Sequence, residues 1–368
     1  MSMSHATGLA GHGGRLCVAR ALYPHAPEPW IDLSTGINPE PYPDVRASAE
    51  ARGRLPMPEE TRALEAAAGG VFGVRDADRI AAAAGSEAVL RLVPYVLRMG
   101  SAVEATAEAA VVLGPTYSSH AAAWRGVGVS VHESGAAADL ATNAARGVVH
   151  GAEPRSSGDA ALPSRAVVTL VNPNNPDGAV VDRERLLALH DEVSSREGYL
   201  VVDEAFADVA PECSVAALAG DARYSRLIVL RSFGKFYGLA GVRLGFVVAA
   251  PPIIARFREL LGDWPVSADA IAVGLAAYAD DAWAERTRER LQQSARRLDD
   301  LLISSGFSIV GGTSLFRLAR SDDARARFES LLRAGILARP FDYDPTLLRF
   351  GLPPDYAWRR LADALRKP

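Results

Sequence analysis

The sequence has few cysteines and no long apolar run. Only two of its 368 residues are cysteine, which is too few for a disulfide framework and suits the reducing cytoplasm. Neither Cys17 nor Cys213 has a metal-ligand partner at close spacing, so we expect both to be buried apolar residues and expect no metal site. Because no run of about 18 apolar residues occurs, no membrane span is expected.

The sequence also lacks an excess of basic charge. Its formal net charge of −4 argues against a broad nucleic-acid surface, although a local basic pocket for a small anion remains compatible with it. The first residues lack the charged start and apolar core of a secretory signal. With 49% hydrophobic and 23% charged residues, the composition is that of a globular protein with a sizeable core. We expect a cytoplasmic protein that binds neither nucleic acid nor membrane.

Short apolar runs alternate with helix-like segments between about residues 80 and 250. Residues 167–171, 199–202 and 227–230 are expected to form buried strands, and Asp182 is expected to cap the helix between the first two. This alternation predicts an α/β fold with a mostly parallel sheet covered by helices. Binding residues should then lie in loops at the carboxyl ends of the strands.

The chain divides by composition into three parts. Residues 1–40, rich in Gly, His and Pro, are expected to form an arm, and residues 41–262 the large domain. Residues 263–368 are expected to form a smaller α+β domain that begins with a long amphipathic helix over 279–305. The weakly patterned segment 133–165 predicts short elements and surface loop.

The most informative segment is SFGKFYGLAGVRLGF, residues 232–246, which directly follows a predicted strand. Lys235 lies there among aromatic and small residues, and burial beside cations would lower its pKa and free its amine for a Schiff base. Ser232 and Arg243 have the hydroxyl and guanidinium that suit a phosphate dianion. The alternative is a surface lysine and a structural arginine in a glycine-rich turn.

DEAF, residues 203–206, ends the strand over 199–202. A carboxylate in such an apolar setting is costly unless a cation pairs with it, and a protonated pyridine nitrogen would be such a partner. For both Asp203 and Glu204, a helix cap or a surface salt bridge is the alternative.

Three further motifs precede or follow these strands. The loop NPNNPDG, residues 172–178, can present amide side chains at the strand ends. Gly85, Ser86 and Glu87 open a predicted helix, where free backbone N–H groups and the helix dipole attract anions. Tyr117 could stack on a flat ligand. An ordinary turn, an ordinary cap and a core tyrosine are the alternatives.

In their order along the chain, these motifs resemble the class I/II aminotransferase superfamily over about residues 85–350. The resemblance implies the aspartate-aminotransferase fold and the cofactor pyridoxal 5'-phosphate (PLP). It further implies that Lys235 carries the cofactor, that Asp203 pairs with the pyridine nitrogen and that Asn175 binds the phenolic oxygen. By the same resemblance Tyr117 stacks on the ring, and the cofactor phosphate is held by Ser86, Ser232 and Arg243, with the backbone of Gly85 and Glu87 beside it.

Two departures from this pattern stand out. Phe206 replaces the tyrosine of many aminotransferases, and Leu55 replaces a tyrosine that in many relatives reaches the neighbouring subunit's cofactor phosphate; we do not transfer that contact. DEAF together with HGG (12–14) and DLSTGINPEPYP (32–43) resembles the threonine-phosphate decarboxylases of cobalamin biosynthesis. Such enzymes convert L-threonine O-3-phosphate to (R)-1-amino-2-propanol O-2-phosphate and carbon dioxide.

The resemblance also implies where the substrate binds. Arg349 matches the carboxylate-binding arginine of the superfamily, Arg339 is a second candidate anion ligand, and relatives form homodimers. Further candidate substrate ligands come from the arm: His12, Gly13, Gly36 and Asn38. Which arginine binds phosphate stays open. So does the reaction, because an aminotransferase acting on a phosphorylated amino acid such as histidinol phosphate is the main alternative. A regulator without turnover and a phosphate-binding scaffold without PLP are the others.

Overall fold

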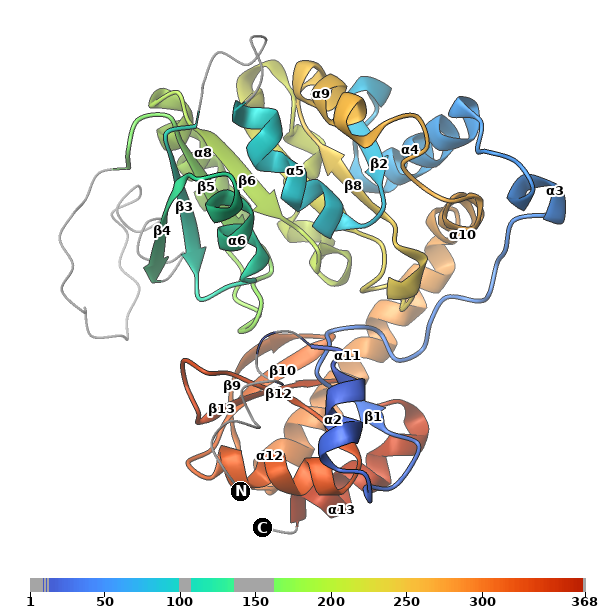
Figure 1. The fold of residues 1–368 in the computed structure, drawn as a ribbon, viewed down its shortest axis with the longest axis vertical. Coiled ribbons are helices and arrows are strands. Elements are labelled where there is room, and N and C mark those ends of the chain that lie inside the picture. The colour runs from blue at the N-terminus through green and yellow to red at the C-terminus, as the bar shows by residue number, and fades with distance from the viewer. Residues whose placement is uncertain (1–8, 10, 12, 99–106, 136–161, 367–368) are drawn as a thin grey trace.

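A computed structural model of the chain describes residues 9, 11, 13–98, 107–135 and 162–366. In Figure 1 the chain forms a larger α/β part and a smaller α+β part, and the long helix α11 (Asp281–Ser304) runs from one to the other. The predicted substrate ligand His12, and residues 136–161 of the predicted loop segment, lie outside the described residues.

The larger part is built on a seven-stranded sheet with the order β2-β8-β7-β6-β5-β3-β4. All neighbouring strands are parallel except β8, which runs antiparallel to both β2 and β7. The strands are β2 (Ile80–Ala83), β3 (Ala109–Gly114), β4 (Ser130–Gly135), β5 (Ala166–Val171), β6 (Tyr199–Asp203), β7 (Leu227–Ser232) and β8 (Gly245–Val248).

Helices cover both faces of this sheet, because its central strands are apolar on both sides. Leu227 and Val229 of β7 pack with one layer of helices, whereas Ile228 and Leu230 pack with the other. The first layer contains α4 (Pro58–Phe72) and α8 (Arg183–Ser195), and the second contains α5 (Ser86–Arg98), α6 (Ser119–Gly126) and α9 (Pro251–Leu261).

The smaller part contains a four-stranded antiparallel sheet with the order β12-β13-β10-β9. Apolar residues of α11 and of the two C-terminal helices form its core. Its elements are β9 (Ser308–Thr313), β10 (Phe316–Arg320), α12 (Ala324–Arg333), β12 (Arg339–Pro340), β13 (Leu347–Gly351) and α13 (Trp358–Arg366).

The arm packs against the smaller part. Its helix α2 (Leu16–Leu22) and strand β1 (Ile31–Asp32) lie beside that part in Figure 1, and β1 pairs in parallel with β11 (Ile336–Leu337). The chain then crosses to the larger part through α3 (Ala49–Arg52). Helix α10 (Ala268–Tyr278) contacts α4 of the larger part. The proposed domain boundaries at residues 40 and 262 stay predictions.

The predicted fold class is confirmed: β5, β6 and β7 coincide with the three predicted strands, and the smaller part is α+β. Asp182 caps α8 as expected, since its side chain accepts a hydrogen bond from the Arg185 amide. The prediction that both cysteines are buried was wrong for Cys17, which is exposed, whereas Leu16, Val18, Ala19 and Leu22 of the short helix α2 pack against the core. No described helix is long and apolar enough to cross a membrane.

Candidate active site

A cavity opens at the carboxyl ends of β5, β6 and β7. Its wall contains Val171, Asp203 and Ser232, which lie at the last positions of those three strands. Most of the residues predicted to bind cofactor or substrate also line it: Gly13, Gly36, Ser86, Glu87, Tyr117, Asn175, Asp203, Ser232, Lys235, Arg243, Arg339 and Arg349. The fold therefore brings together residues from the arm and from loops and strands of both parts of the chain.

Lys235 lies in the loop that follows β7, and it is the only lysine among the described residues. Burial lowers the pKa of its amine to about 8, and the nearby guanidinium of Arg349 acts in the same direction. A lysine with such a pKa is largely protonated at neutral pH but has an accessible neutral form, as Schiff-base chemistry requires.

Asn38 fixes the Lys235 loop from the arm. Its backbone N–H donates to the Lys235 carbonyl oxygen at 2.9 Å, and its side-chain Nδ2 donates to the Phe236 carbonyl oxygen at 2.9 Å. Asn38 is buried and does not line the cavity. The structure therefore does not place Asn38 at the substrate site. Its hydrogen bonds instead hold the Lys235 loop in position.

Asp203 is buried at the end of β6, where its Oδ2 lies 3.0 Å from Nε2 of His120. Its Oδ1 accepts a hydrogen bond from the Ala205 backbone at 3.0 Å. His120, in the first turn of α6, is a residue that sequence reasoning missed. The available signal was its position three residues after Tyr117, whose ring meets the imidazole edge-to-face at 6.2 Å.

The neighbouring Glu204 points away from the cavity. Its carboxylate is completely buried and pairs with Arg231 at 2.8 Å, while Ser214 Oγ and the Val215 amide donate to it. The second guanidinium nitrogen of Arg231 binds Asp208. The salt-bridge alternative therefore holds for Glu204, in a buried form, whereas Asp203 has His120 as its partner and lines the cavity.

The NPNNPDG loop presents one of its three asparagines to the cavity. Asn172 exchanges two hydrogen bonds with the Val181 backbone, and Asn174 Nδ2 donates to Asp177 at 2.8 Å. With these two side chains committed to the loop, Asn175 faces the cavity, where its Oδ1 accepts a hydrogen bond from Arg349. The asparagine-proline spacing predicted the loop, and the hydrogen bonds within it decide which asparagine side chain faces the cavity.

One end of the cavity is shaped for a phosphate. Gly85 has a φ of +90°, and a side-chain carbon there would lie 2.6 Å from the Arg243 guanidinium, so glycine is required. Ser86 is the first residue of α5. Strand β8 passes close to its backbone, and this approach requires glycine at position 245, since a side-chain carbon there would lie 2.3 Å from the Ser86 amide nitrogen. The helix dipole, the Ser232 hydroxyl and Arg243 converge on this end. The Glu87 carboxylate instead pairs with Arg91.

The other end of the cavity contains two adjacent arginines. Arg339 of β12 and Arg349 of β13 are cross-strand partners in an antiparallel pair. Burial, together with the neighbouring charge of Arg339, lowers the pKa of Arg349 to about 9. The Nε atom of each is buried without a hydrogen-bond partner. Like charges opposite each other on a sheet are unfavourable, so this end is built to receive an anion.

Phe206 closes the cavity beside these arginines. Its ring meets that of Phe316 edge-to-face at 5.1 Å, and the Arg349 guanidinium lies over the Phe316 ring, also at 5.1 Å. A carbon added at Gly36 would lie 2.8 Å from Phe316 and 3.0 Å from Phe206. The arm can therefore reach the cavity wall only because this residue has no side chain.

These features fit the predicted cofactor. Ser86, Ser232 and Arg243, the Lys235 amine and the Asp203 carboxylate line the same cavity, so an anion site, an amine and a carboxylate are available there for the phosphate, the aldehyde and the ring nitrogen of the cofactor. No group of three or more His, Cys, Asp or Glu side chains in the described part of the chain could hold a metal ion.

Comparison with known proteins agrees with this site. The family model "Aminotransferase class I and II" matches residues 29–365. The chain belongs to this family. Its PLP dependence, predicted from the motifs, follows from that membership.

Relatives of two activities resemble this class I/II chain. A threonine-phosphate decarboxylase from Pseudomonas aeruginosa is 40% identical over 355 residues, which cover 96% of each chain. A second one, from Sinorhizobium sp, is 38% identical over 357 residues and covers 97% of each. A histidinol-phosphate aminotransferase from Thermobifida fusca is 30% identical over 331 residues, 85% of this chain and 84% of the relative.

Solved structures show the same fold. Histidinol-phosphate aminotransferase from Sinorhizobium meliloti, solved in complex with pyridoxal-5'-phosphate, has a TM-score of 0.77 at 21% identity and covers 100% of this chain and 96% of its own. L-threonine-O-3-phosphate decarboxylase from Porphyromonas gingivalis has a TM-score of 0.69 at 18% identity, with 90% of this chain and 97% of its own covered.

Proposed function

We propose that this protein is a PLP-dependent carboxy-lyase that decarboxylates L-threonine O-3-phosphate to (R)-1-amino-2-propanol O-2-phosphate. The observation that carries the proposal is the pair Arg339–Arg349, two cross-strand cations beside the lysine, of which Arg349 is buried and Arg339 is half-buried, and whose Nε atoms both lack a partner. A substrate with both a carboxylate and a phosphate supplies the two anionic groups that this pair needs. The near full-length similarity to threonine-phosphate decarboxylases supports the same substrate.

Five residues of the cavity would bind the cofactor. Ser86, Ser232 and Arg243 would hold the cofactor phosphate, and Lys235 would carry the cofactor covalently. Asp203 would face the pyridine nitrogen, with His120 keeping its carboxylate in place. When bound, the pyridoxal ring supplies the electron sink that accepts the pair released as carbon dioxide leaves.

Lys235 has two successive tasks in this proposal. Its neutral amine is needed to attach the cofactor, and a pKa of about 8 keeps that form accessible near neutral pH. Once the substrate amine replaces it, the freed lysine can carry a proton. After the bond from the substrate α-carbon to its carboxylate breaks, the Nζ of Lys235 can deliver that proton to the α-carbon. Arg339 and Arg349 meanwhile bind the anionic groups.

The decisive experiment uses purified holoenzyme and O-phospho-L-threonine without any keto acid. We expect stoichiometric carbon dioxide and an amino-propanol phosphate product, and no turnover of L-threonine, which lacks the phosphate. Arg339→Gln should raise KM for the phosphorylated substrate. The proposal fails if carbon dioxide does not form while histidinol phosphate and 2-oxoglutarate exchange an amino group.

That amino-group exchange is the second candidate function. The similarity to a histidinol-phosphate aminotransferase over 85% of the chain favours it, and the same lysine, aspartate and arginines could serve it. Histidinol phosphate carries no carboxylate, whereas 2-oxoglutarate, which accepts its amino group, carries two, so the arginine pair could serve both halves of this exchange. The higher identity to threonine-phosphate decarboxylases over nearly the whole chain favours the decarboxylase.

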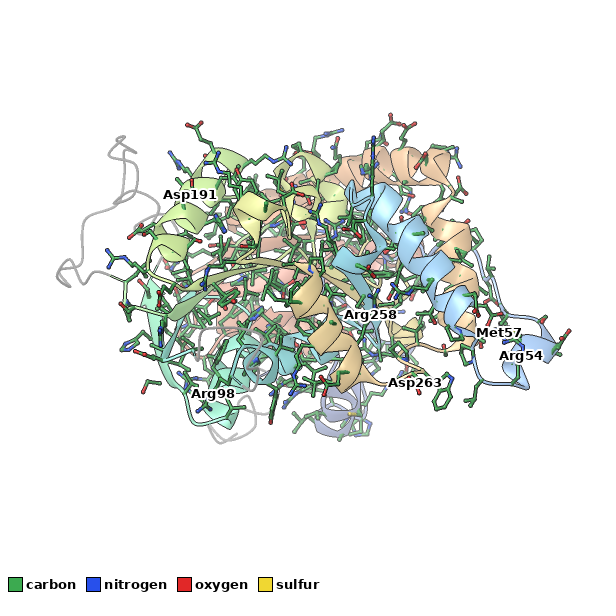
Figure 2. All side chains as sticks on the ribbon, turned by 90° about the horizontal axis from the view of Figure 1, so that it is seen from above. Arg54, Met57, Arg98, Asp191, Arg258 and Asp263 are labelled. Carbon is green, nitrogen blue, oxygen red and sulfur yellow. The ribbon has the colours of Figure 1, made fainter. Side chains whose placement is uncertain are left out.

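We also propose a cytoplasmic homodimer that acts in cobalamin biosynthesis. Exposed apolar side chains support the dimer: Met57 and Trp264 are 48% and 55% exposed, and Trp264 lines a surface groove beside Pro58. Met57 lies at the outer edge of the molecule in Figure 2, next to Arg54. Sedimentation-equilibrium measurements should give twice the 39.0 kDa chain mass; a monomer at micromolar concentration would contradict this.

A further inference from the structure

Ser34 is a residue of the arm that lies between Gly13 and Gly14 and the arginine end of the cavity. It is 2% exposed and comes two residues after β1. It lines the cavity together with Gly13. Its hydroxyl faces the arm, and its backbone carbonyl faces Arg349, so a single residue contacts both of the segments that enclose the anion-binding end.

The hydroxyl holds the glycine segment of the arm. Ser34 Oγ accepts a hydrogen bond from the Gly14 backbone N–H at 2.8 Å and donates to Asp32 Oδ1 at 2.5 Å. The same Asp32 oxygen accepts from the Ser34 backbone at 2.8 Å. Because the hydroxyl proton is committed to Asp32, the oxygen lone pairs are left for Gly14. A carbon added at Gly13 would lie 2.4 Å from the Ser34 carbonyl oxygen, so glycine permits this approach.

The carbonyl of the same residue holds the substrate arginine. Arg349 Nη2 donates to the Ser34 carbonyl oxygen at 2.6 Å. The backbone on either side is locked to β13: the Gly351 N–H donates to the Leu33 carbonyl oxygen at 2.7 Å, and a carbon added at Gly351 would lie 2.2 Å from the Thr35 carbonyl oxygen. Ser34 thus has a fixed position relative to the strand from which Arg349 projects.

We propose that Ser34 is a positioning residue that fastens Gly13 and Gly14 over the arginine end of the cavity and so sets the affinity for the anionic substrate. Arg339 Nη2 also reaches this segment, at 3.4 Å from the Gly11 carbonyl oxygen. With the segment in place, less water reaches Arg339 and Arg349, and their attraction for an anion is stronger in the lower dielectric. Ser34 acts on binding and not on proton transfer at Lys235.

This inference rests on the proposed function only in naming the anion as a phosphorylated amino acid. In the full-length holoenzyme, Ser34→Ala is expected to raise KM for O-phospho-L-threonine about tenfold, the worth of one buried hydrogen bond. The value of kcat should stay within about twofold, and the visible absorption of the bound cofactor should not change. Trypsin should cleave after Arg15 faster in the variant, because the segment before it is no longer fastened.

Ser267→Ala is the matched control. Ser267 Oγ accepts a hydrogen bond from the Ala270 backbone at 3.1 Å, at the start of α10 and outside the cavity lining. This change removes the same kind of bond and should alter neither KM nor the cleavage after Arg15. Should Ser34→Ala not fold, Asp32→Leu, which has a similar size but no acceptor oxygen for the Ser34 hydroxyl, should speed the cleavage in the same direction.

Two outcomes overturn the inference. One is an unchanged rate of cleavage after Arg15 in both Ser34→Ala and Asp32→Leu. The other is a fall in kcat together with a loss of cofactor absorption, because that would assign Ser34 to the general stability of the site. Cleavage is measured without substrate, so a wild-type enzyme that releases no carbon dioxide would refute the proposed function and leave this test standing.

Discussion

Arg231→Met is expected to lower the free energy of unfolding by about 3–5 kcal/mol. The Arg231 side chain is 5% exposed and lies between Glu204 and Asp208, whose side chains are 0% and 7% exposed. Its guanidinium also lies 4.4 Å from the centre of the Phe72 ring. Methionine would keep most of the apolar contact with Phe72, but the two buried carboxylates would lose their cation. Most of the lost free energy of unfolding comes from these unpaired buried charges.

The pH dependence of this loss has a definite sign. Burial raises the pKa of the Glu204 carboxyl even in the intact protein, and removal of Arg231 would raise it further. A group with a raised pKa in the folded state stabilises the fold at low pH, and that contribution is lost as the pH rises through the folded value. The deficit of Arg231→Met should therefore be smaller at pH 5 than at pH 8.

Equilibrium unfolding in urea, followed by far-UV circular dichroism on cofactor-free protein, measures both effects. Arg223→Met is the matched control, because the Arg223–Asp191 pair has a similar separation of 2.9 Å but side chains that are 69% and 47% exposed; since solvent screens this pair, the change should leave the free energy of unfolding nearly unaltered. Adding Asp208→Asn to Arg231→Met should restore part of the loss. A loss for Arg231→Met no larger than that of the control would refute the reasoning.

Three further predictions concern the cofactor. Lys235→Ala should fold but show no visible cofactor absorption, and borohydride reduction should leave no cofactor on the chain; a retained reducible linkage would contradict the assignment. His120→Phe removes the hydrogen bond to Asp203 and should weaken cofactor binding about tenfold by fluorescence titration, with an unchanged affinity arguing against its role. The rate of cofactor attachment should rise with pH through a midpoint near 8, because only the neutral Lys235 amine reacts. Since the charge of Arg349 lowers the pKa of Lys235, Arg349→Gln should move that midpoint to higher pH. An unmoved midpoint would mean that Arg349 does not influence Lys235.

Much of the sheet could be predicted because its central strands are buried on both faces. The runs that became β5, β6 and β7 are continuous in apolar residues, so their type and position follow from composition alone. The residues at their carboxyl ends follow as well, since parallel strands end at one edge of the sheet. Asp203 and Lys235 were predictable from this rule and from their chemistry.

Residues that act through distant contacts could not be predicted in the same way. His120 reaches Asp203 from a helix 83 positions earlier in the chain, and Asn38 reaches the Lys235 loop across 198 positions. An imidazole or an amide in a sequence does not show its partner, because the pairing exists only after the sheet and the arm have packed. Cys17 illustrates the converse: a residue type that is often buried lies exposed when its short helix offers only one face to the core.

The choice between decarboxylation and amino-group transfer is the hardest property to predict from the sequence, and the contacts of Arg349 show why. Its guanidinium is placed by Asn175 of the larger part, by the Ser34 carbonyl of the arm and by the Phe316 ring of the smaller part. These three segments meet only in the folded chain, so no local pattern specifies the direction in which the arginine holds the substrate. That direction decides which bond of the substrate α-carbon is activated. The same lysine and aspartate can therefore serve either activity, and discrimination between them depends on how the arm and the smaller part pack against the larger one.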